Sequence, residues 1–171
     1  MVIQHIKYRG KFFLVATTGY GKANAAMAIT YLMEEYPGLE TVINIDLALS
    51  TNDKFDTTDA VMSTKFIYRD ADLTVFKDIK YGQAIHEPET FVFNTDFVNQ
   101  VKNFKLGVSD GIVGTADMLI YNSKQFKEMV DKFGQSIDVI DTEAGAFAQV
   151  AKKSTMNFIA LKIIYNNALS P

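Results

Sequence analysis

The chain has 171 residues, 48% of them hydrophobic and 12% aromatic, so we expect one domain with one core over residues 1–171. The formal net charge of −3 leaves no basic excess to neutralise phosphates, which argues against nucleic acid as a partner. Cysteine is absent, which excludes disulfides and thiolate metal sites and fits a cytoplasmic location. No apolar run is long enough to cross a bilayer, so direct membrane insertion is not expected.

The first half of the chain predicts a hairpin, a helix and two buried strands. The second strand of the hairpin is rich in large apolar residues from Phe12 to Val15, and we expect it to be mostly buried. Pro37-Gly38 ends the helix, and near-continuous apolar runs mark the later strands, as a parallel sheet requires. Residues 77–94 look irregular. The predicted elements are strands at 2–8 and 11–17, a helix from 22 to about 36, and strands at 41–49 and 60–68.

Two short motifs in this half invite a ligand interpretation. The turn from Gly19 to Lys22 joins a strand to a helix, but Ala23 follows the lysine where a P-loop has Ser or Thr, and the upstream glycine is missing. Tight packing is the simpler reason for these glycines. Asp70 and Asp72 beside Arg69 could ligate a metal, but such a cluster is more often an ion-paired loop. We therefore predict no metal site and no cofactor.

The second half of the chain continues the alternation of helices and strands. Asn122 or Ser123 is expected to cap a helix that Gly134 ends. Strands that alternate with helices predict an α/β fold with a mainly parallel core. The predicted elements are a helix from Asn94 or Thr95 to Phe104, a strand at 105–113, a helix at 124–133, a strand at 137–140, a helix after Glu143 and a strand at 158–164.

The stretch from Asp141 to Val150 reads as a buried strand that passes directly into a helix. Glu143 would then lie in the first helical turn, at the sheet edge where α/β proteins hold ligands. A carboxylate at this place is favoured by the helix dipole, stays ionised and can accept hydrogen bonds from a sugar diol. The alternative is that Asp141 and Glu143 only cap the helix. The local sequence leaves both interpretations open.

Four segments resemble motifs of the 5′-methylthioadenosine/S-adenosylhomocysteine nucleosidases, a family related to the purine nucleoside phosphorylases. Their order and spacing agree along nearly the whole chain. The matching segments are G-Y-G-K-A-N-A-A from Gly19, Y-R-D-A-D-L-T-V-F from Tyr68 with Tyr81-Gly82-Gln83, T-A-D-M-L-I from Thr115, and D-T-E-A-G-A-F-A-Q-V from Asp141.

The resemblance implies a twisted, mixed and mainly parallel central sheet flanked by helices, and a homodimer. The family's first strand, with the glutamate that serves as general base, and its last helix would fall outside this sequence, so the chain is expected to be part of a longer one. The segment from Tyr68 to Gln83 corresponds to the family's dimer contact. Its expected contact residues are Tyr68, Phe76, Ile79 and Tyr81.

The residues that carry the family's chemistry are mostly replaced. The glycine-rich strand end N-T-G-S-A-G-G corresponds to Asn44–Ser50, which has no glycine, and Leu47 stands where a serine lies near the attacking water. The catalytic aspartate corresponds to Asn166, whose amide cannot deliver a proton, and such acid catalysis is typically worth ~10²–10⁴ in rate. The vestigial nucleoside-binding positions are Leu47, Leu119, Ile120, Thr142 and Glu143, of which Ile120 and Glu143 are retained.

Three functions remain open on these residues. The runs N-D-K-F-D-T-T-D and L-K-I-I-Y-N-N-A-L-S-P resemble a filament-forming cytoskeletal branch of this fold, which implies a non-catalytic building block that associates with itself and supports cell shape and motility. The alternatives are a nucleosidase that hydrolyses the N-glycosidic bond with relocated catalytic groups, and a nucleoside-binding module without turnover. The lost glycines and the lost acid together favour the first, so neither catalysis nor adenine nucleoside binding is expected.

Overall fold

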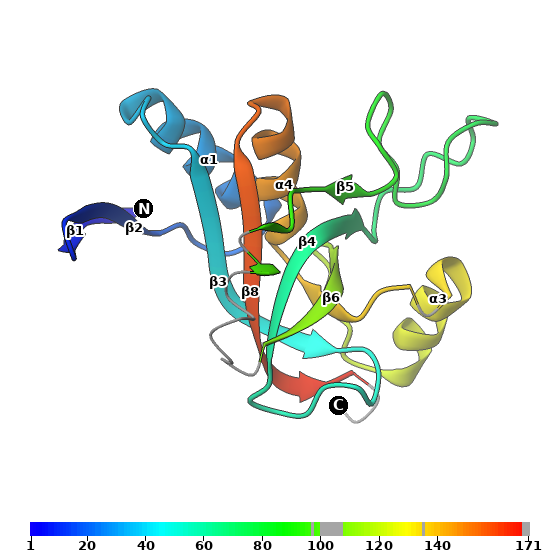
Figure 1. Ribbon diagram of the computed structural model, residues 1–171. Coiled ribbons are helices and arrows are strands. Elements are labelled where there is room, and N and C mark those ends of the chain that lie inside the picture. Colours follow the sequence, from blue (N-terminus) through cyan, green and yellow to red (C-terminus); the bar gives the residue numbers. More distant parts are fainter. Residues whose placement is uncertain (97, 100–107, 135, 169–171) are drawn as a thin grey trace.

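The computed structural model describes residues 1–96, 98–99, 108–134 and 136–168 (Figure 1). Its strands and helices alternate along the chain, which confirms the predicted α/β class. In chain order the elements are β1 (Val2–Tyr8), β2 (Lys11–Thr17), α1 (Lys22–Glu35), β3 (Thr41–Ser50), β4 (Ala60–Tyr68), β5 (Phe91–Val92), β6 (Val108–Thr115), α3 (Ser123–Phe133), β7 (Val139–Asp141), α4 (Ala144–Lys153) and β8 (Asn157–Asn167).

Six strands form the central sheet, in the order β5-β4-β6-β7-β3-β8, and β8 also pairs with β4. This extra pairing closes the sheet on itself. The long β3–β8 and β4–β6 pairings are parallel, whereas β3–β7, β4–β5 and β4–β8 are short and antiparallel. The sheet is therefore mixed and mainly parallel, as the sequence predicted.

Helices α1 and α4 lie side by side against the sheet and cover the main core (Figure 1). Alanines on the buried faces of both helices keep the backbones close to each other and to the strands. Aromatic rings fill the space beneath, where the Phe158 ring lies 4.8 Å from the Phe66 ring and 6.0 Å from the Phe147 ring, measured between centroids. This packing fixes the N-terminal end of α4 against the central strands.

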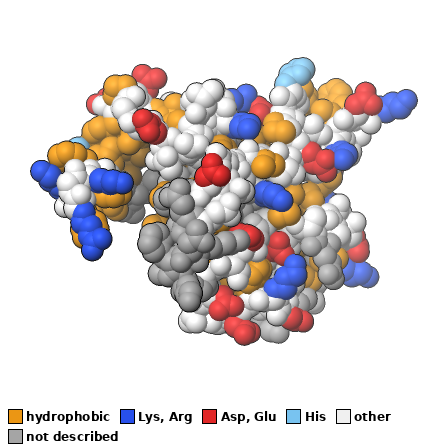
Figure 2. Space-filling model, viewed as in Figure 1, with side chains coloured by type: hydrophobic (Ala, Val, Ile, Leu, Met, Phe, Trp, Pro, Cys, Tyr) orange, Lys and Arg blue, Asp and Glu red, His pale blue; other side chains and the backbone are white. Residues whose placement is uncertain are grey.

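The hairpin forms where it was predicted, but its second strand is not buried. β1 and β2 make a separate two-stranded antiparallel sheet, which extends from the body and carries basic side chains near its turn (Figure 2). Phe12 is 78% exposed, and Phe13 and Val15 are also exposed. The prediction of burial was wrong because alternation along a strand reports its two faces, whereas burial requires another layer to cover them.

A groove of about 470 Å³ separates β2 from the first half of β3. Its floor includes Leu32 of α1 and Phe147 of α4, and its far end reaches Asp46 and Glu143. Within the described residues, β3 pairs on this side only through Leu49 and Ser50, with β7. The groove therefore lies between β2 and the first half of β3 and leads to Asp46 and Glu143.

The remaining predicted elements differ from the observed ones mainly in their first and last residues. Of the predicted helix that ends at Phe104, residues 94–96, 98 and 99 are described; residues 96, 98 and 99 are helical, residues 94 and 95 are not, and the rest lies outside the described residues. The predicted strand at 105–113 is observed from Val108 to Thr115, and residues 105–107 are likewise not described. Asn122 caps α3 as predicted, with its Oδ1 accepting from the Gln125 N–H at 2.9 Å. Across the described ranges, none of the helices is both long and apolar enough to cross a membrane.

Candidate functional site: a strand-end pocket

The site lies where β7 ends and α4 begins, and Asp141 caps the helix. The Asp141 Oδ2 accepts from the Ala144 N–H at 2.9 Å, which satisfies one of the free donors of the first helical turn. Glu143 immediately precedes the helix but makes no capping hydrogen bond to it. The two carboxylates therefore have different roles, and the capping alternative holds for Asp141 alone.

Asp141 also anchors a buried ion pair. The Lys162 Nζ of β8 lies 2.7 Å from the Asp141 Oδ2, and the lysine side chain is 0% exposed. The Thr115 hydroxyl donates to the Asp141 Oδ1 at 2.5 Å and accepts from the Gly145 N–H at 2.8 Å. These contacts join β6, β7, β8 and α4 beneath the pocket. A single lysine within the apolar run F-I-A-L-K-I-I was the sequence signal for this pair, because buried lysines need a partner.

Glu143 is bonded within the protein. Its Oε1 accepts from the Gly21 N–H at 2.8 Å and from the Thr142 hydroxyl, so the carboxyl holds the turn that precedes α1. Gly21 has a φ of 91°, a conformation that favours glycine, and a Cβ added there would lie 3.1 Å from the Asp117 Oδ1, so both conformation and close packing account for glycine at this position. Two donors of the protein therefore already bond to one oxygen of the carboxylate that the sequence predicted as an acceptor for a sugar diol.

The environment of Glu143 also shifts its pKa. Burial raises its pKa above the ordinary value of 4.5, and a hydrogen bond with Asp46 and the charge of Asp141 act in the same direction. The Gly21 N–H and the Thr142 hydroxyl oppose the shift. The helix dipole, worth about 0.3–1 kcal/mol, favours the ionised form, whereas desolvation of the buried carboxylate favours the protonated form and has the larger effect on the pKa.

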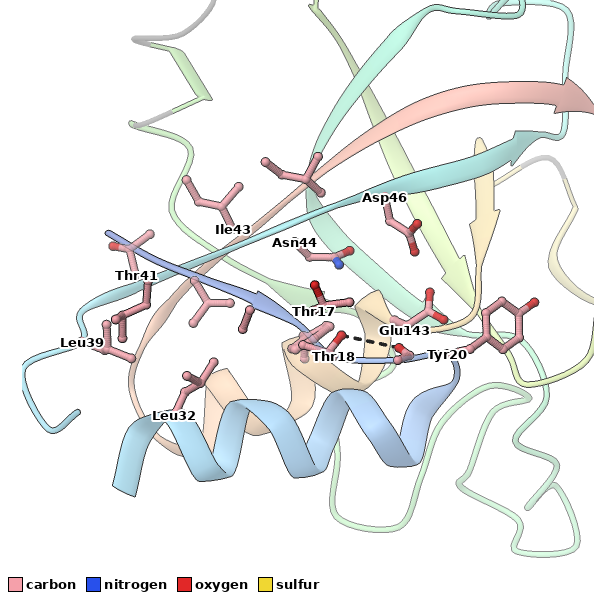
Figure 3. Close-up of a pocket in the computed structure, with 16 residues that line it drawn as sticks. Thr17, Thr18, Tyr20, Leu32, Leu39, Thr41, Ile43, Asn44, Asp46 and Glu143 are labelled. Atoms are coloured by element: carbon pink, nitrogen blue, oxygen red, sulfur yellow. Dashed lines mark hydrogen bonds between the residues drawn. The ribbon is translucent and has the colours of Figure 1, made fainter. Parts of the chain in front are cut away.

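Asp46 faces Glu143 from the opposite side of the site. On β3 the side chains alternate, so Asn44, Asp46 and Ala48 turn inward while Leu47 turns outward. Figure 3 shows the Asp46 carboxyl directed toward Glu143. The Asp46 Oδ2 lies 3.9 Å from the Lys162 Nζ. Of the residues that stand in place of the family's glycine-rich strand end, Asp46 therefore enters the site, whereas the sequence predicted Leu47 there.

The five vestigial binding positions meet around one pocket of about 270 Å³. Ile120, Thr142 and Glu143 are buried, whereas Leu47 is 56% exposed and Leu119 is also exposed, so both lie at the rim. The pocket is smaller than the ~300–1,000 Å³ usual for a drug-sized ligand. The vestigial set that lines it is Leu47, Leu119, Ile120, Thr142 and Glu143, joined by Tyr20, Asp46, Ala48, Leu49, Arg69, Ile140, Asp141 and Tyr165.

Asn166 is not among the residues that line this pocket. It is exposed, and its Oδ1 accepts from the Asn167 N–H at 2.9 Å. A register shift between Ala48 and Leu49 pairs Asn166 with Leu49, and the neighbouring Tyr165 lines the pocket instead. The structure thus separates the position of the family's acid from the vestigial binding set.

The segment after β4 makes ion pairs within the protein. The Lys22 Nζ lies 2.8 Å from the Asp70 Oδ2, and the Lys22 N–H donates to the Asp117 Oδ1 at 2.9 Å. The buried Arg69 donates from its Nη2 to the Met118 carbonyl, and burial lowers the pKa of its guanidinium. The ion-paired interpretation of this segment is consistent with these contacts, although the lysine of α1, not Arg69, is the close partner of Asp70.

The four expected dimer-contact residues differ in exposure. Tyr68 is 8% exposed and its hydroxyl donates to the Gln149 Oε1 at 2.8 Å, so its ring belongs to the core and is not available to a partner. Phe76 is 52% exposed, whereas Ile79 is half-buried. The half-buried Tyr81 ring packs on Phe133 at 5.3 Å between centroids. The part of this segment that is exposed to a partner is therefore centred on Phe76.

The fold is that of the nucleoside phosphorylases and related nucleosidases. The phosphorylase superfamily matches residues 2–171, and the chain belongs to this family. Its curated relatives include the fibril protein of Spiroplasma citri, which is 75% identical over 99% of this chain. The chain spans about a third of that relative, 33% of its length.

Nucleosidases are more distant relatives. The 5′-methylthioadenosine/S-adenosylhomocysteine nucleosidase of Shewanella sediminis is 27% identical, with 93% of this chain and 70% of the enzyme covered. The structure of an aspartate-to-asparagine variant of the Helicobacter pylori nucleosidase, with 5′-methylthioadenosine in its active site, superimposes with a TM-score of 0.87. It is 19% identical and covers 97% of this chain and 72% of that one, so it supports the fold alone.

Proposed function

We propose that this chain is a non-catalytic, nucleosidase-fold building block of a self-assembling cytoskeletal filament in the cytoplasm, where it supports cell shape and motility. The observation that carries the proposal is the 75% identity to a fibril protein, whose name describes an assembly and not a reaction. The internal bonds of the site agree with it, because the Gly21 N–H and the Thr142 hydroxyl both bond to the Glu143 Oε1. A protein can keep a fold while its chemistry is lost, because core and site are separable.

The catalytic alternative is hydrolysis of the N-glycosidic bond of 5′-methylthioadenosine or S-adenosylhomocysteine. The gathering of the five vestigial positions around one pocket favours it. The exposed Asn166, which cannot act as an acid, argues against it. We expect no adenine release from either compound, and turnover near ordinary enzyme rates, ~1–10³ per second, would refute the non-catalytic proposal.

The self-association that the proposal requires is expected at the loop between β4 and β5. Val75 and Phe76 of this loop are exposed, and Figure 1 shows the loop extending from the body. Acidic and basic side chains surround these apolar ones, which is the composition of a protein interface. Substituting Phe76→Asp should weaken association, because it would place a charge in an apolar contact.

Sedimentation velocity tests this assembly step. Phe76→Asp should move the distribution toward smaller species, whereas Phe12→Asp, a matched change at an exposed phenylalanine of the hairpin, should leave it unchanged. If Phe76→Asp sediments like the unaltered protein, the loop is not the contact. If the unaltered protein remains monomeric at every protein concentration measured, the proposed building block does not associate by itself.

A further inference from the structure

One face of the hairpin formed by β1 and β2 is apolar and exposed. Residues that pair across the two strands lie on the same face, so Ile6 and Phe13 share a face with the side chains two positions away along each strand. Five large apolar side chains of this face are each between 42% and 63% exposed, and a patch of this kind marks an interaction surface. This outer hairpin face consists of Val2, Ile6, Tyr8, Phe13 and Val15.

The opposite face of the hairpin contacts the body of its own chain. The Tyr36 hydroxyl, which directly follows α1, lies 3.2 Å from the His5 Nε2, and Leu14 lines the groove beside β3. Phe12 pairs with Lys7 and therefore lies on this second face. The hairpin is thus held on one side by its own chain, which leaves the outer hairpin face toward solvent.

Basic side chains lie at the turn end of the outer hairpin face. The Arg9 guanidinium lies over the Tyr8 ring, 5.3 Å from its centroid, and Lys11 pairs opposite Tyr8. Residues 1–17 contain three basic residues and no acidic one, whereas the whole chain has a net charge of −3. A partner surface that complements this face should therefore combine exposed apolar side chains with carboxylates.

The outward side of α1 has this composition. Met27 and Tyr31 lie four positions apart and are 56% and 45% exposed, and Glu34 and Glu35 follow them in the last turn. That turn contains no basic residue, and carboxylates at the C-terminal end of a helix are unfavourable because the helix dipole is negative there. Helix stability therefore does not explain these glutamates. Figure 2 shows acidic side chains over this end of α1 and basic ones around the hairpin.

We propose that the outer hairpin face of one copy docks on the outward side of α1 of a second copy. The two surfaces adjoin on each molecule, because His5 contacts Tyr36, so two copies can exchange them around a two-fold axis. The inference deepens the proposed function and rests on it, since an assembly longer than a dimer requires a second contact.

The position of the hairpin suits such a second contact. Figure 1 shows the hairpin and the loop between β4 and β5 projecting from opposite ends of the molecule. A single two-fold contact stops at a dimer, whereas one contact at each end can join copies into an open chain.

Charge reversal followed by mixing tests the contact by sedimentation velocity. One variant carries Arg9→Glu with Lys11→Glu, the other carries Glu34→Lys with Glu35→Lys, and both also carry Phe76→Asp so that the hairpin contact is measured alone. The Phe76→Asp protein should form dimers. Each reversal should raise the dimer dissociation constant at least about tenfold, because like charges would meet across the contact. An equimolar mixture of the two variants should dimerise again, since each hairpin then meets an α1 of opposite charge.

The apolar part of the contact has its own variant and control. In the Phe76→Asp protein, Ile6→Asp should weaken the dimer, whereas Phe12→Asp, on the opposite face of the hairpin, should leave it unchanged. If circular dichroism shows that Ile6→Asp unfolds the hairpin, the charge reversals decide, because they lie at exposed positions.

Three results would overturn the inference. They are a monomeric Phe76→Asp protein, a dimer that the reversals leave unchanged, and a mixture of the two variants that stays monomeric. The unaltered chain separates this failure from that of the proposed function. If it associates but Phe76→Asp is monomeric, self-association stands without the hairpin contact, and if it never associates, the proposed building block fails as well.

Discussion

Lys162→Met should strongly destabilise the protein, because it leaves the buried Asp141 carboxylate without its cation. The lysine is 0% exposed, and its ammonium lies 2.7 Å from the Asp141 Oδ2 and 3.9 Å from the Asp46 Oδ2. The ammonium has no well-aligned hydrogen bond among the described residues, so its attraction to the carboxylates is mainly coulombic. Methionine has a similar length and removes only the charge. Breaking a buried pair in this way typically costs about 3–5 kcal/mol.

Thermal and urea unfolding measure this loss. For a chain of this size 1 kcal/mol corresponds to roughly 2–4 °C, so Tm should fall by roughly 6–20 °C. Lys54→Met is the matched control, because Lys54 also pairs with an aspartate, at 3.0 Å, but is 68% exposed and should change stability by less than about 1 kcal/mol.

The combination Lys162→Met with Asp141→Asn should recover part of the loss, because the amide still accepts from the Ala144 N–H but carries no charge. Two outcomes would contradict the reasoning. One is a cost for Lys162→Met below about 1 kcal/mol, and the other is a double variant no more stable than Lys162→Met alone.

Three further predictions concern single positions. Burial raises the pKa of Glu143, so the folded state binds this proton more tightly than the unfolded chain does. The stability that results is fully present below the ordinary pKa of 4.5 and is lost as the pH rises through the raised pKa. Glu143→Gln should remove that part of the pH dependence in urea titrations across the mildly acidic range, and an unchanged slope would show that Glu143 does not titrate there. Gly145→Ala should cost about 1–3 kcal/mol, because its Cβ would lie 2.9 Å from the Thr115 Cβ, whereas Gly38→Ala, with open space around it, serves as the control in thermal unfolding. Asn122→Ala should cost about 1 kcal/mol through loss of the α3 cap, and no change in Tm would mean that the cap does not stabilise the helix.

Much of the fold could be read from local pattern. The apolar run of β3, the proline and glycine after α1 and the Asn122 cap each act within a few residues, so their consequences appear in any short stretch of the chain. The α/β class followed from the order of these elements. The resemblance placed Leu47, Thr142 and Glu143 at the site, and the structure brings all three to one pocket.

The contacts inside the site could not be read in the same way, because they join residues far apart in the chain. The Gly21–Glu143 hydrogen bond spans 122 positions, and the ionic contact between Lys162 and Asp46 joins two different strands. Whether Glu143 is ionised depends on how deeply the neighbouring elements bury it, which no local pattern contains.

Sequence by itself determined which segments become strands and helices, since periodicity and capping act over one or two turns. Tertiary structure alone decided which faces are covered. The alternation in β2 and β3 specified two faces for each strand. Phe12 is exposed because none of the described residues forms a layer over the hairpin, whereas Asp46 enters the site because the inward face of β3 meets α4. Burial and charge state follow from what packs opposite a residue, and that is a property of the assembled chain.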